Sequence, residues 1–187
     1  MRQTVVRLIG LLCVAVLTPA AWAATPHTPP ADTLNVDYFS NANTPGAPDG
    51  ELRMTNPGTT GDLWSAIYIF DPEQEMSECC ACFSSVDGGT GMSINNDLTN
   101  NPLTGVILTT GLIKIVSTEG TNAYQLIPTP SLRGWTTHIQ NGSFAVTETA
   151  SQNATLSTAE VNRLEAECSG IQTDGSGKGI CGCGSGE

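Results

Sequence analysis

Basic side chains are scarce in this sequence. Its 187 residues hold 7 Lys and Arg against 18 Asp and Glu, which gives a formal net charge of −11. Binding to nucleic acid requires patches of positive charge, so this balance excludes nucleic acid as a partner. Histidine is scarcer still, at two residues. The fingerprints of serine hydrolases, zinc proteases, phosphate-binding loops and dinucleotide-binding folds are all missing.

Long hydrophobic runs are confined to the start of the chain. Two arginines precede an apolar segment at residues 8–17, and small residues follow at Ala21 and Ala23. This order predicts a signal peptide over residues 1–23, cleaved after Ala23 or Ala24. The apolar segment is shorter than the roughly 20 residues of a spanning helix, so we expect a secreted or periplasmic protein without a membrane anchor. Cleavage would leave 5 basic residues against 18 acidic ones, a net charge of −13.

Short apolar stretches separated by turn-forming residues predict a chain built mainly of β-strands. A flexible Pro-rich leader is expected over residues 24–33, followed by one domain over residues 34–187. Seven or eight short strands with Gly, Pro and Asn between them favour a single antiparallel β-sandwich, immunoglobulin-like or similar. The expected strands cover residues 34–39, 52–55, 64–70, 92–94, 106–109, 112–117, 132–140 and 144–149.

The most apolar of these stretches, residues 64–70, is rich in aromatic and β-branched side chains and predicts a central strand. Asp71 and Pro72 stop it, and the acidic residues that follow predict a short capped helix. Paired carboxylates could instead serve a secreted carbohydrate-active hydrolase, with its acids between Glu73 and Glu78. Both interpretations stay open.

A second helix is specified more completely, over residues 157–168. Ser157 and Glu160 form a capping box at its start. Val161, Leu164 and Cys168 then fall at helical spacing, so that one face is apolar and carries the cysteine inward. The Gly-rich tail that follows carries a Cys-x-Cys motif at residues 181–183.

Six cysteines remain after the leader, in two groups of three. An even count in an exported chain predicts disulfides, and bridges between the groups would fasten the helix and the tail to the end of the central strand. Six cysteines allow 15 pairings, so the connectivity stays open. The alternative is a metal-binding or redox module, although Cys-x-Cys differs from the usual Cys-x2-Cys spacing. The predicted disulfide residues are Cys79, Cys80, Cys82, Cys168, Cys181 and Cys183.

Polar side chains between residues 95 and 101 could offer oxygen ligands to calcium. Their spacing does not match an EF-hand loop, so no cofactor is expected, with Ca²⁺ or a thiolate-bound metal as the alternatives. The oxygen-bearing residues are Asn95, Asn96, Asp97, Asn100 and Asn101.

Neither histidine has the neighbours of a catalytic base. His27 lies in the expected leader. His138 lies in an expected strand, on the face opposite Trp135 and Ile139. We expect it to be a surface or cross-strand residue.

Four blocks of the chain are similar to a known group of proteins. The Cys-Cys-x-Cys block at residues 71–82, together with residues 95–105, 112–116 and the closing Cys-x-Cys at 179–183, resembles a family of exported proteins from soil bacteria. The resemblance covers most of the chain after the leader and implies a bacterial, exported origin. It implies no activity, cofactor or site residue, because that family has none assigned.

These observations favour a non-enzymatic exported protein of the cell surface or extracellular matrix that acts by binding or assembly. Missing catalytic motifs, a disulfide-stiffened β-scaffold and polar loops support this interpretation. Its partner would be a cell-surface or polysaccharide ligand or a second copy of the chain. The alternatives are the carbohydrate-active hydrolase and the cysteine-based metal or redox module.

Overall fold

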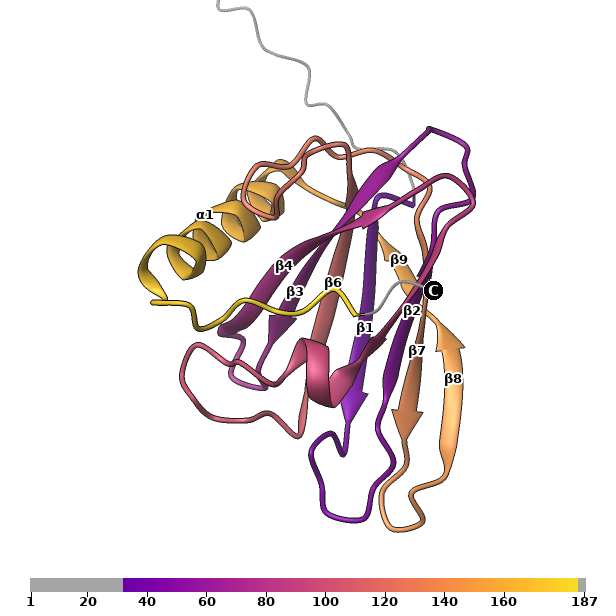
Figure 1. Ribbon diagram of the computed structural model, residues 1–187, viewed down its shortest axis with the longest axis vertical. Helices are drawn as coiled ribbons and strands as arrows, with labels where there is room; N and C mark the ends of the chain where they lie inside the picture. Colours follow the sequence, from indigo (N-terminus) through magenta and orange to yellow (C-terminus); the bar gives the residue numbers. More distant parts are fainter. Residues whose placement is uncertain (1–31, 185–187) are drawn as a thin grey trace, which may run out of the picture.

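The computed structural model describes residues 32–184. The predicted signal peptide, His27 and nearly all of the predicted leader lie outside this range. Within it, two antiparallel β-sheets stack on one another and an α-helix covers the outer face of one of them (Figure 1). None of the helices in this range is long and apolar enough to cross a membrane.

The larger sheet is the middle layer of the molecule. Its interior strand β3, which lies between β4 and β6, alternates Ile67 and Ile69, which face the other sheet, with Tyr68 and Phe70, which face the helix. Both of its faces are buried, which explains the continuous apolar run and confirms the predicted central strand. In spatial order the strands are β4 (Met76–Ser84), β3 (Leu63–Phe70), β6 (Thr110–Thr118), β1 (Leu34–Ser40) and β9 (Gln152–Ala154).

The smaller sheet has one buried and one solvent-facing side. Leu52, Met54 and Met92 point inward and pack against the larger sheet, whereas Arg53 and Trp135 point outward. The predicted class, a mainly β antiparallel sandwich with a C-terminal helix and disulfide staples, is confirmed. In spatial order the strands are β5 (Gly89–Ser93), β2 (Glu51–Thr55), β7 (Arg133–Ile139) and β8 (Val146–Ala150).

The helix α1 (Thr158–Asp174) begins as predicted and ends later. Ser157 is the N-cap, and its hydroxyl accepts a hydrogen bond from the Glu160 N–H at 3.1 Å. The predicted end at residue 168 is wrong, because Ile171 continues the buried face three residues beyond Cys168. Docking of that face against the sheet outweighs the poor helix propensity of Gly170.

The short helix predicted after Asp71 is also wrong. The Asp71 N–H donates to the Glu75 carbonyl at 3.0 Å, and the Asp71 carboxylate accepts from the Glu75 N–H at 2.8 Å. These bonds close a tight turn that joins β3 directly to β4, a strand that the pattern of apolar residues does not reveal. The side chain that was expected to cap a helix caps a turn.

The strand predicted at residues 106–109 does not form, and residues 110 and 111, which separate the predicted strands 106–109 and 112–117, lie inside β6. Pairing of β6 stops at Thr110 and Leu112, where its neighbours β1 and β3 end, so residues 106–109 have no strand to pair with. A side chain at Gly111 would place its Cβ 2.7 Å from the Phe39 ring. Glycine is therefore required here for close packing.

Asn95 to Leu98, for which no helix or strand was predicted, form regular structure. They form a single π-helical turn, η1 (Ile94–Leu98), at the end of β5. Ile94 and Leu98 are buried in the core between the sheets, which accounts for the turn being held in place.

Candidate functional site

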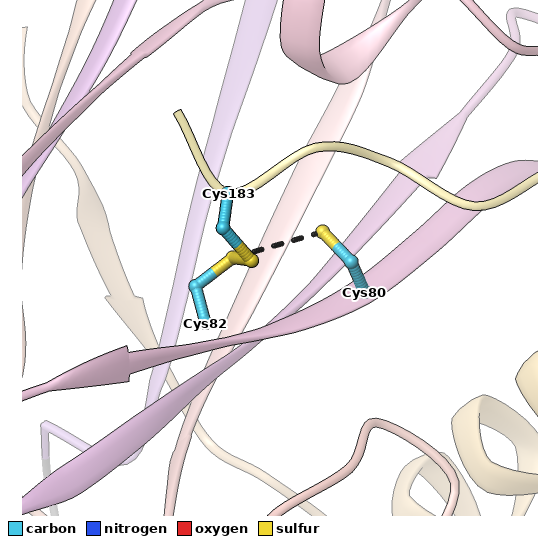
Figure 2. A group of neighbouring side chains, drawn as sticks. All are labelled: Cys80, Cys82 and Cys183. Carbon is cyan, nitrogen blue, oxygen red and sulfur yellow. Dashed lines mark hydrogen bonds between the residues drawn. A yellow bond between two sulfur atoms is a disulfide. The ribbon is translucent and has the colours of Figure 1, made fainter. Parts of the chain in front are cut away.

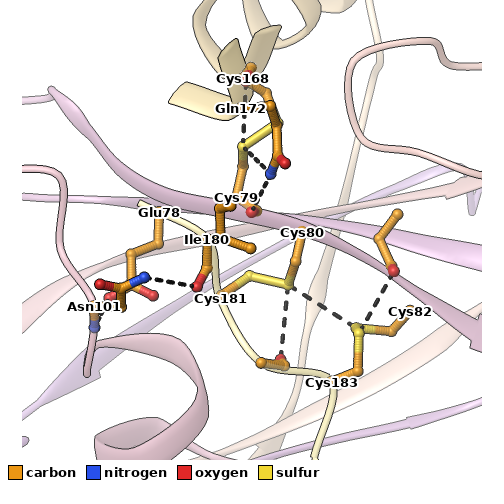
Figure 3. Close-up of a disulfide and its surroundings, with 12 residues drawn as sticks. Glu78, Cys79, Cys80, Cys82, Asn101, Cys168, Gln172, Ile180, Cys181 and Cys183 are labelled. Atoms are coloured by element: carbon orange, nitrogen blue, oxygen red, sulfur yellow. Dashed lines mark hydrogen bonds between the residues drawn. A yellow bond between two sulfur atoms is a disulfide. The ribbon is translucent and has the colours of Figure 1, made fainter. Parts of the chain in front are cut away.

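Strand β4 carries three of the six cysteines, and its alternation divides them between two faces. Cys79 points toward α1, whereas Cys80 and Cys82 point toward the core between the sheets. Each pairs with one cysteine of the C-terminal group (Figure 3). The bridges are Cys79–Cys168, Cys80–Cys181 and Cys82–Cys183, with Cα–Cα distances of 5.9, 5.2 and 5.3 Å.

Residues 179–184, here called the tail (yellow in Figure 1), lie beside β4, and Ile180 forms a parallel bridge with Cys79 on the edge of β4 that faces away from β3. The Cys79 N–H donates to the Gly179 carbonyl at 2.8 Å, as a neighbouring strand would accept it. On its other side the tail meets η1, where the Gly182 N–H donates to the Asp97 carbonyl at 2.7 Å. The tail is thus held by backbone hydrogen bonds and by two disulfides.

Three cysteine sulfur atoms lie close together where the tail packs against β4. Among residues 32–184, Cys80, Cys82 and Cys183 form the one group of three His, Cys, Asp or Glu residues whose ligand atoms lie within 4.8 Å of one another (Figure 2). All three belong to disulfides, which carry no thiolate charge for a metal ion. Metal binding here would first require reduction of both bridges.

Glu78 lies beside this cluster and is fully buried. One carboxylate oxygen accepts a hydrogen bond from the Asn101 N–H at 3.0 Å, and the other has no hydrogen-bond partner among residues 32–184. Burial raises the pKa of this carboxyl to about 7, and the hydrogen bond from Asn101 offsets only part of that rise. The Asn101 side chain donates to the Gly177 carbonyl at 2.8 Å and to the Ile180 carbonyl at 3.4 Å, so Glu78 is linked to the C-terminal segment (Figure 3).

A groove of about 520 Å³ lies between the C-terminal half of α1 and the β3–β4 turn. Its apolar lining comes from Met76 on β4, Leu103 on the loop after η1, and Ile171 on the helix. Hydrogen bonds fix that loop, because the Leu103 N–H donates to the Ser77 carbonyl at 3.0 Å. The volume is within the range of pockets that bind small ligands or a few side chains of a larger one.

The charged residues that line this groove are acidic. They are Glu75 from the turn and Glu167 and Asp174 from the helix. Arg163 pairs with Glu167 at 3.2 Å, whereas neither Glu75 nor Asp174 forms an ion pair within residues 32–184. We call this site the acidic groove.

Gly170 forms part of the wall of the acidic groove. Apart from its chain neighbours and the backbone of its own helix, no atom of the described part of the chain lies within 4 Å of the position that a Cβ would take there. A glycine inside a helix costs about 1 kcal/mol relative to alanine, and no packing contact requires this one. Its effect is to leave the groove open on the helix side.

The structure does not bring together the carboxylates expected for a hydrolase. Glu73 and Glu75 are exposed in the β3–β4 turn, whereas Glu78 is buried in β4. Glu75 shares the acidic groove with Glu167, which sequence reasoning missed. A known pairing of Cys168 with Cys79 would have indicated that Glu167 lies near Glu75, because this disulfide brings the part of the helix that carries Glu167 toward the start of β4.

The residues expected as calcium ligands take part in holding loops. The Asp97 carboxylate accepts from the Ser93 N–H at 2.7 Å, and the Asn95 side-chain oxygen accepts from the Asn43 N–H at 2.9 Å. Asn96 donates to Asp49 at 3.3 Å. Asn100 bonds the Asn96 carbonyl and Asn101 bonds the segment before the tail, so these side chains turn to different partners.

His138 is buried, which corrects the expectation of a surface position. Its ring stacks on Tyr38 with centroids 4.2 Å apart, and Nε2 lies 2.6 Å from the Thr149 hydroxyl on β8. The cross-strand part of the expectation is confirmed. The inward face of β7 is the one that carries His138, because Trp135 points to solvent.

No family model, curated protein or solved structure matches this chain. The fold and the site are therefore interpreted from their own chemistry. Three disulfides indicate an oxidising, extracellular compartment.

Proposed function

We propose that this protein is an exported, non-enzymatic binding protein of the cell surface or extracellular matrix, and that its acidic groove binds a cationic amphipathic peptide segment. One observation carries the proposal, namely an apolar concavity edged by carboxylates and left open by Gly170. The bacterial origin and the signal peptide that the sequence predicts are parts of the same proposal.

The lining of the groove selects this class of ligand. The exposed Leu103 offers apolar area to aliphatic side chains, beside the largely buried Met76 and Ile171, and burial of such area is the main driving force for binding. Glu75 and Asp174 then favour Lys or Arg beside them. The net charge of −11 steers a basic ligand toward the protein. A polysaccharide fits less well, because no aromatic ring lines the groove.

Binding is favoured over self-assembly by the charge on the exposed edge strand. β8 is the outer strand of the smaller sheet, and all five of its residues are exposed. Symmetric antiparallel pairing with a second copy about its middle residue would place Glu148 opposite Glu148. Like charges directly opposite each other destabilise such a pair, as gatekeeper charges do on edge strands.

The test fills the groove without disturbing the fold. Gly170→Trp places an indole where the structure has open space, and Gly170→Ala is the matched control. A short synthetic peptide of alternating Lys and Leu serves as the probe in isothermal titration calorimetry. We expect binding to the native protein and to the Ala variant, and at least a tenfold loss (about 1.4 kcal/mol) with Trp.

Equal affinity for the Trp and Ala variants would overturn the proposal, as would the absence of binding to the native protein. Polysaccharide binding that Gly170→Trp leaves unchanged would also overturn it in favour of another surface. Glu75→Gln with Asp174→Asn should weaken peptide binding and flatten its salt dependence.

The second candidate is a secreted carbohydrate-active hydrolase, and one observation favours it. Glu75 and Glu167 line the same groove from different elements, and glycosidases act through two carboxylates that flank the scissile bond. Release of reducing ends from a polysaccharide panel, lost in both Glu75→Gln and Glu167→Gln, would support it. If the native protein releases no reducing ends from the panel, the hydrolase candidate is contradicted.

A further inference from the structure

The three disulfides differ in their access to solvent. Cys79 and Cys168 are fully buried on the helix side of β4. On the other side Cys80, Cys82 and Cys181 are buried, whereas Cys183 is exposed. A thiolate in solution must reach a sulfur atom to exchange with a disulfide, so Cys183 is the point of entry.

The sulfur atoms behind that entry point lie close together. Cys82, the bonded partner of Cys183, has its Sγ 3.9 Å from the Sγ of Cys80, which belongs to the neighbouring bridge (Figure 2). Both sulfurs project from the same face of one strand, so the pairing of β4 with β3 keeps them adjacent. A thiolate formed on Cys82 would therefore be held against the second disulfide.

We propose that Cys82–Cys183 is a thiol–disulfide exchange site that reacts with external thiols and passes the exchange to Cys80–Cys181, so that both attachments of the tail open while Cys79–Cys168 stays closed. The reacting partner is a small-molecule or protein thiol. This inference concerns the tail and does not depend on the acidic groove.

The chemistry balances in two exchange steps. An external thiolate attacks the Cys183 sulfur, forms a mixed disulfide there, and releases Cys82 as a thiolate. That thiolate attacks the Cys80 sulfur, forms Cys80–Cys82, and releases Cys181 as a thiolate that takes a proton from water. In sum the external thiol is oxidised into the mixed disulfide and Cys181 is reduced. Attack of Cys181 on the mixed disulfide would then form Cys181–Cys183 and return the external thiol.

The strand can accommodate the new bridge. Residues two apart on a strand have Cα atoms about 6.6 Å apart, which is near the upper end of the range that disulfides span. The loop at Leu103 bonds β4 at Ser77, and the tail borders the strand beyond that point, so detachment of the tail leaves the stretch that carries Cys80 and Cys82 freer to bend. The helix bridge takes no part, because Cys79 lies on the opposite face.

The test maps the thiols of the native, oxidised protein after brief exposure to glutathione. The reaction is quenched with acid, free thiols are alkylated, and peptides are identified by mass spectrometry. After the two exchange steps we expect glutathione on Cys183, an alkylated Cys181 and a Cys80–Cys82 bridge. If Cys181 has then displaced the glutathione, we expect the bridges Cys80–Cys82 and Cys181–Cys183. Cys79–Cys168 should open at least about tenfold more slowly.

Two results would overturn the proposal. Alkylation of Cys82 with Cys80–Cys181 intact would show exchange without transfer, and opening of Cys79–Cys168 at the same rate would show reaction through global unfolding. Cys80→Ser combined with Cys181→Ser provides the matched control. It removes the acceptor bridge, so glutathione should reach Cys183 at the native rate and the alkylated thiol should move to Cys82.

Discussion

The helix α1 and the tail are fastened to the same strand, from opposite faces and by different physical means. The helix buries Leu164, Cys168 and Ile171 against the larger sheet. In the tail only Gly179 and Cys181 are buried, and Ile180 is 38% exposed. The helix is therefore held by apolar burial and one disulfide, whereas the tail depends on two disulfides and a few backbone hydrogen bonds.

Chain entropy adds to this difference, because the loops that the three bridges close overlap along the chain. Cys79 and Cys80 are adjacent in β4, and their partners Cys168 and Cys181 lie in one C-terminal segment. Once the helix bridge has closed its long loop, each tail bridge closes only a short one. The contributions to stability are then smaller than those of three independent long loops.

The largest expected effect follows removal of both tail bridges. Replacing Cys80, Cys82, Cys181 and Cys183 by Ala should lower the free energy of unfolding by about 5 kcal/mol, measured by urea denaturation. Hydrogen exchange should show an unprotected Cys79 N–H, because its acceptor Gly179 is released.

The matched control is the pair Cys79→Ala and Cys168→Ala. It should cost about 3 kcal/mol and leave the amides of α1 protected, since the helix keeps its apolar contacts. Loss of protection throughout α1 in this control would contradict the comparison between helix and tail.

Leu164→Ala tests the apolar attachment of the helix directly. Leu164 is fully buried under the sheet, and truncation of such a leucine costs about 2–5 kcal/mol. Thermal denaturation should show the loss, with a smaller one for the half-buried Val161→Ala. A cost for Leu164→Ala below that for Val161→Ala would mean that the disulfide alone holds the helix.

Glu78 makes the tail side of β4 sensitive to pH. Its pKa is about 7 in the folded protein against 4.5 as an ordinary carboxyl, so the folded state binds the proton more tightly. The resulting stability is fully present below pH 4.5 and is lost as pH rises through 7, by about 3 kcal/mol at most. Denaturation across this range should show the decline in the native protein and a flatter profile in Glu78→Gln. Parallel profiles would contradict the assignment.

The smallest expected effect on the free energy of unfolding follows substitution of Gly170, which lies in the wall of the acidic groove. Gly170→Ala should raise the free energy of unfolding by about 0.5–1 kcal/mol, because alanine restricts the unfolded chain and meets open space in the folded one. Urea denaturation can measure this gain. A loss of stability would show that Gly170 is required by packing.

The elements that local patterns define could be predicted from the sequence. Strand β3 is apolar on both faces, and Ser157 with Glu160 marks the start of α1 whatever the rest of the chain does. The division of the cysteines into two groups likewise indicated which segments the bridges would join. Each of these signals is contained within a few residues.

Features that depend on distant partners could not be predicted. β4 mixes cysteines with the buried Glu78, so its apolar alternation is hidden until β3 is placed beside it. Residues 106–109 have strand-like composition and no neighbouring strand. The acidic groove joins Glu75 and Glu167, which are far apart in the sequence and meet only after α1 has docked.

The position of the tail along β4 also bears on how this protein avoids aggregation. β4 is the last strand of its sheet, and an uncovered edge strand offers hydrogen-bonding groups to any passing chain. The tail occupies part of that edge in the manner of a sixth strand, with Ile180 bridged to Cys79. The tail thereby covers part of the edge of β4. Detachment of the tail would expose this edge strand, which could then pair with strands of other chains.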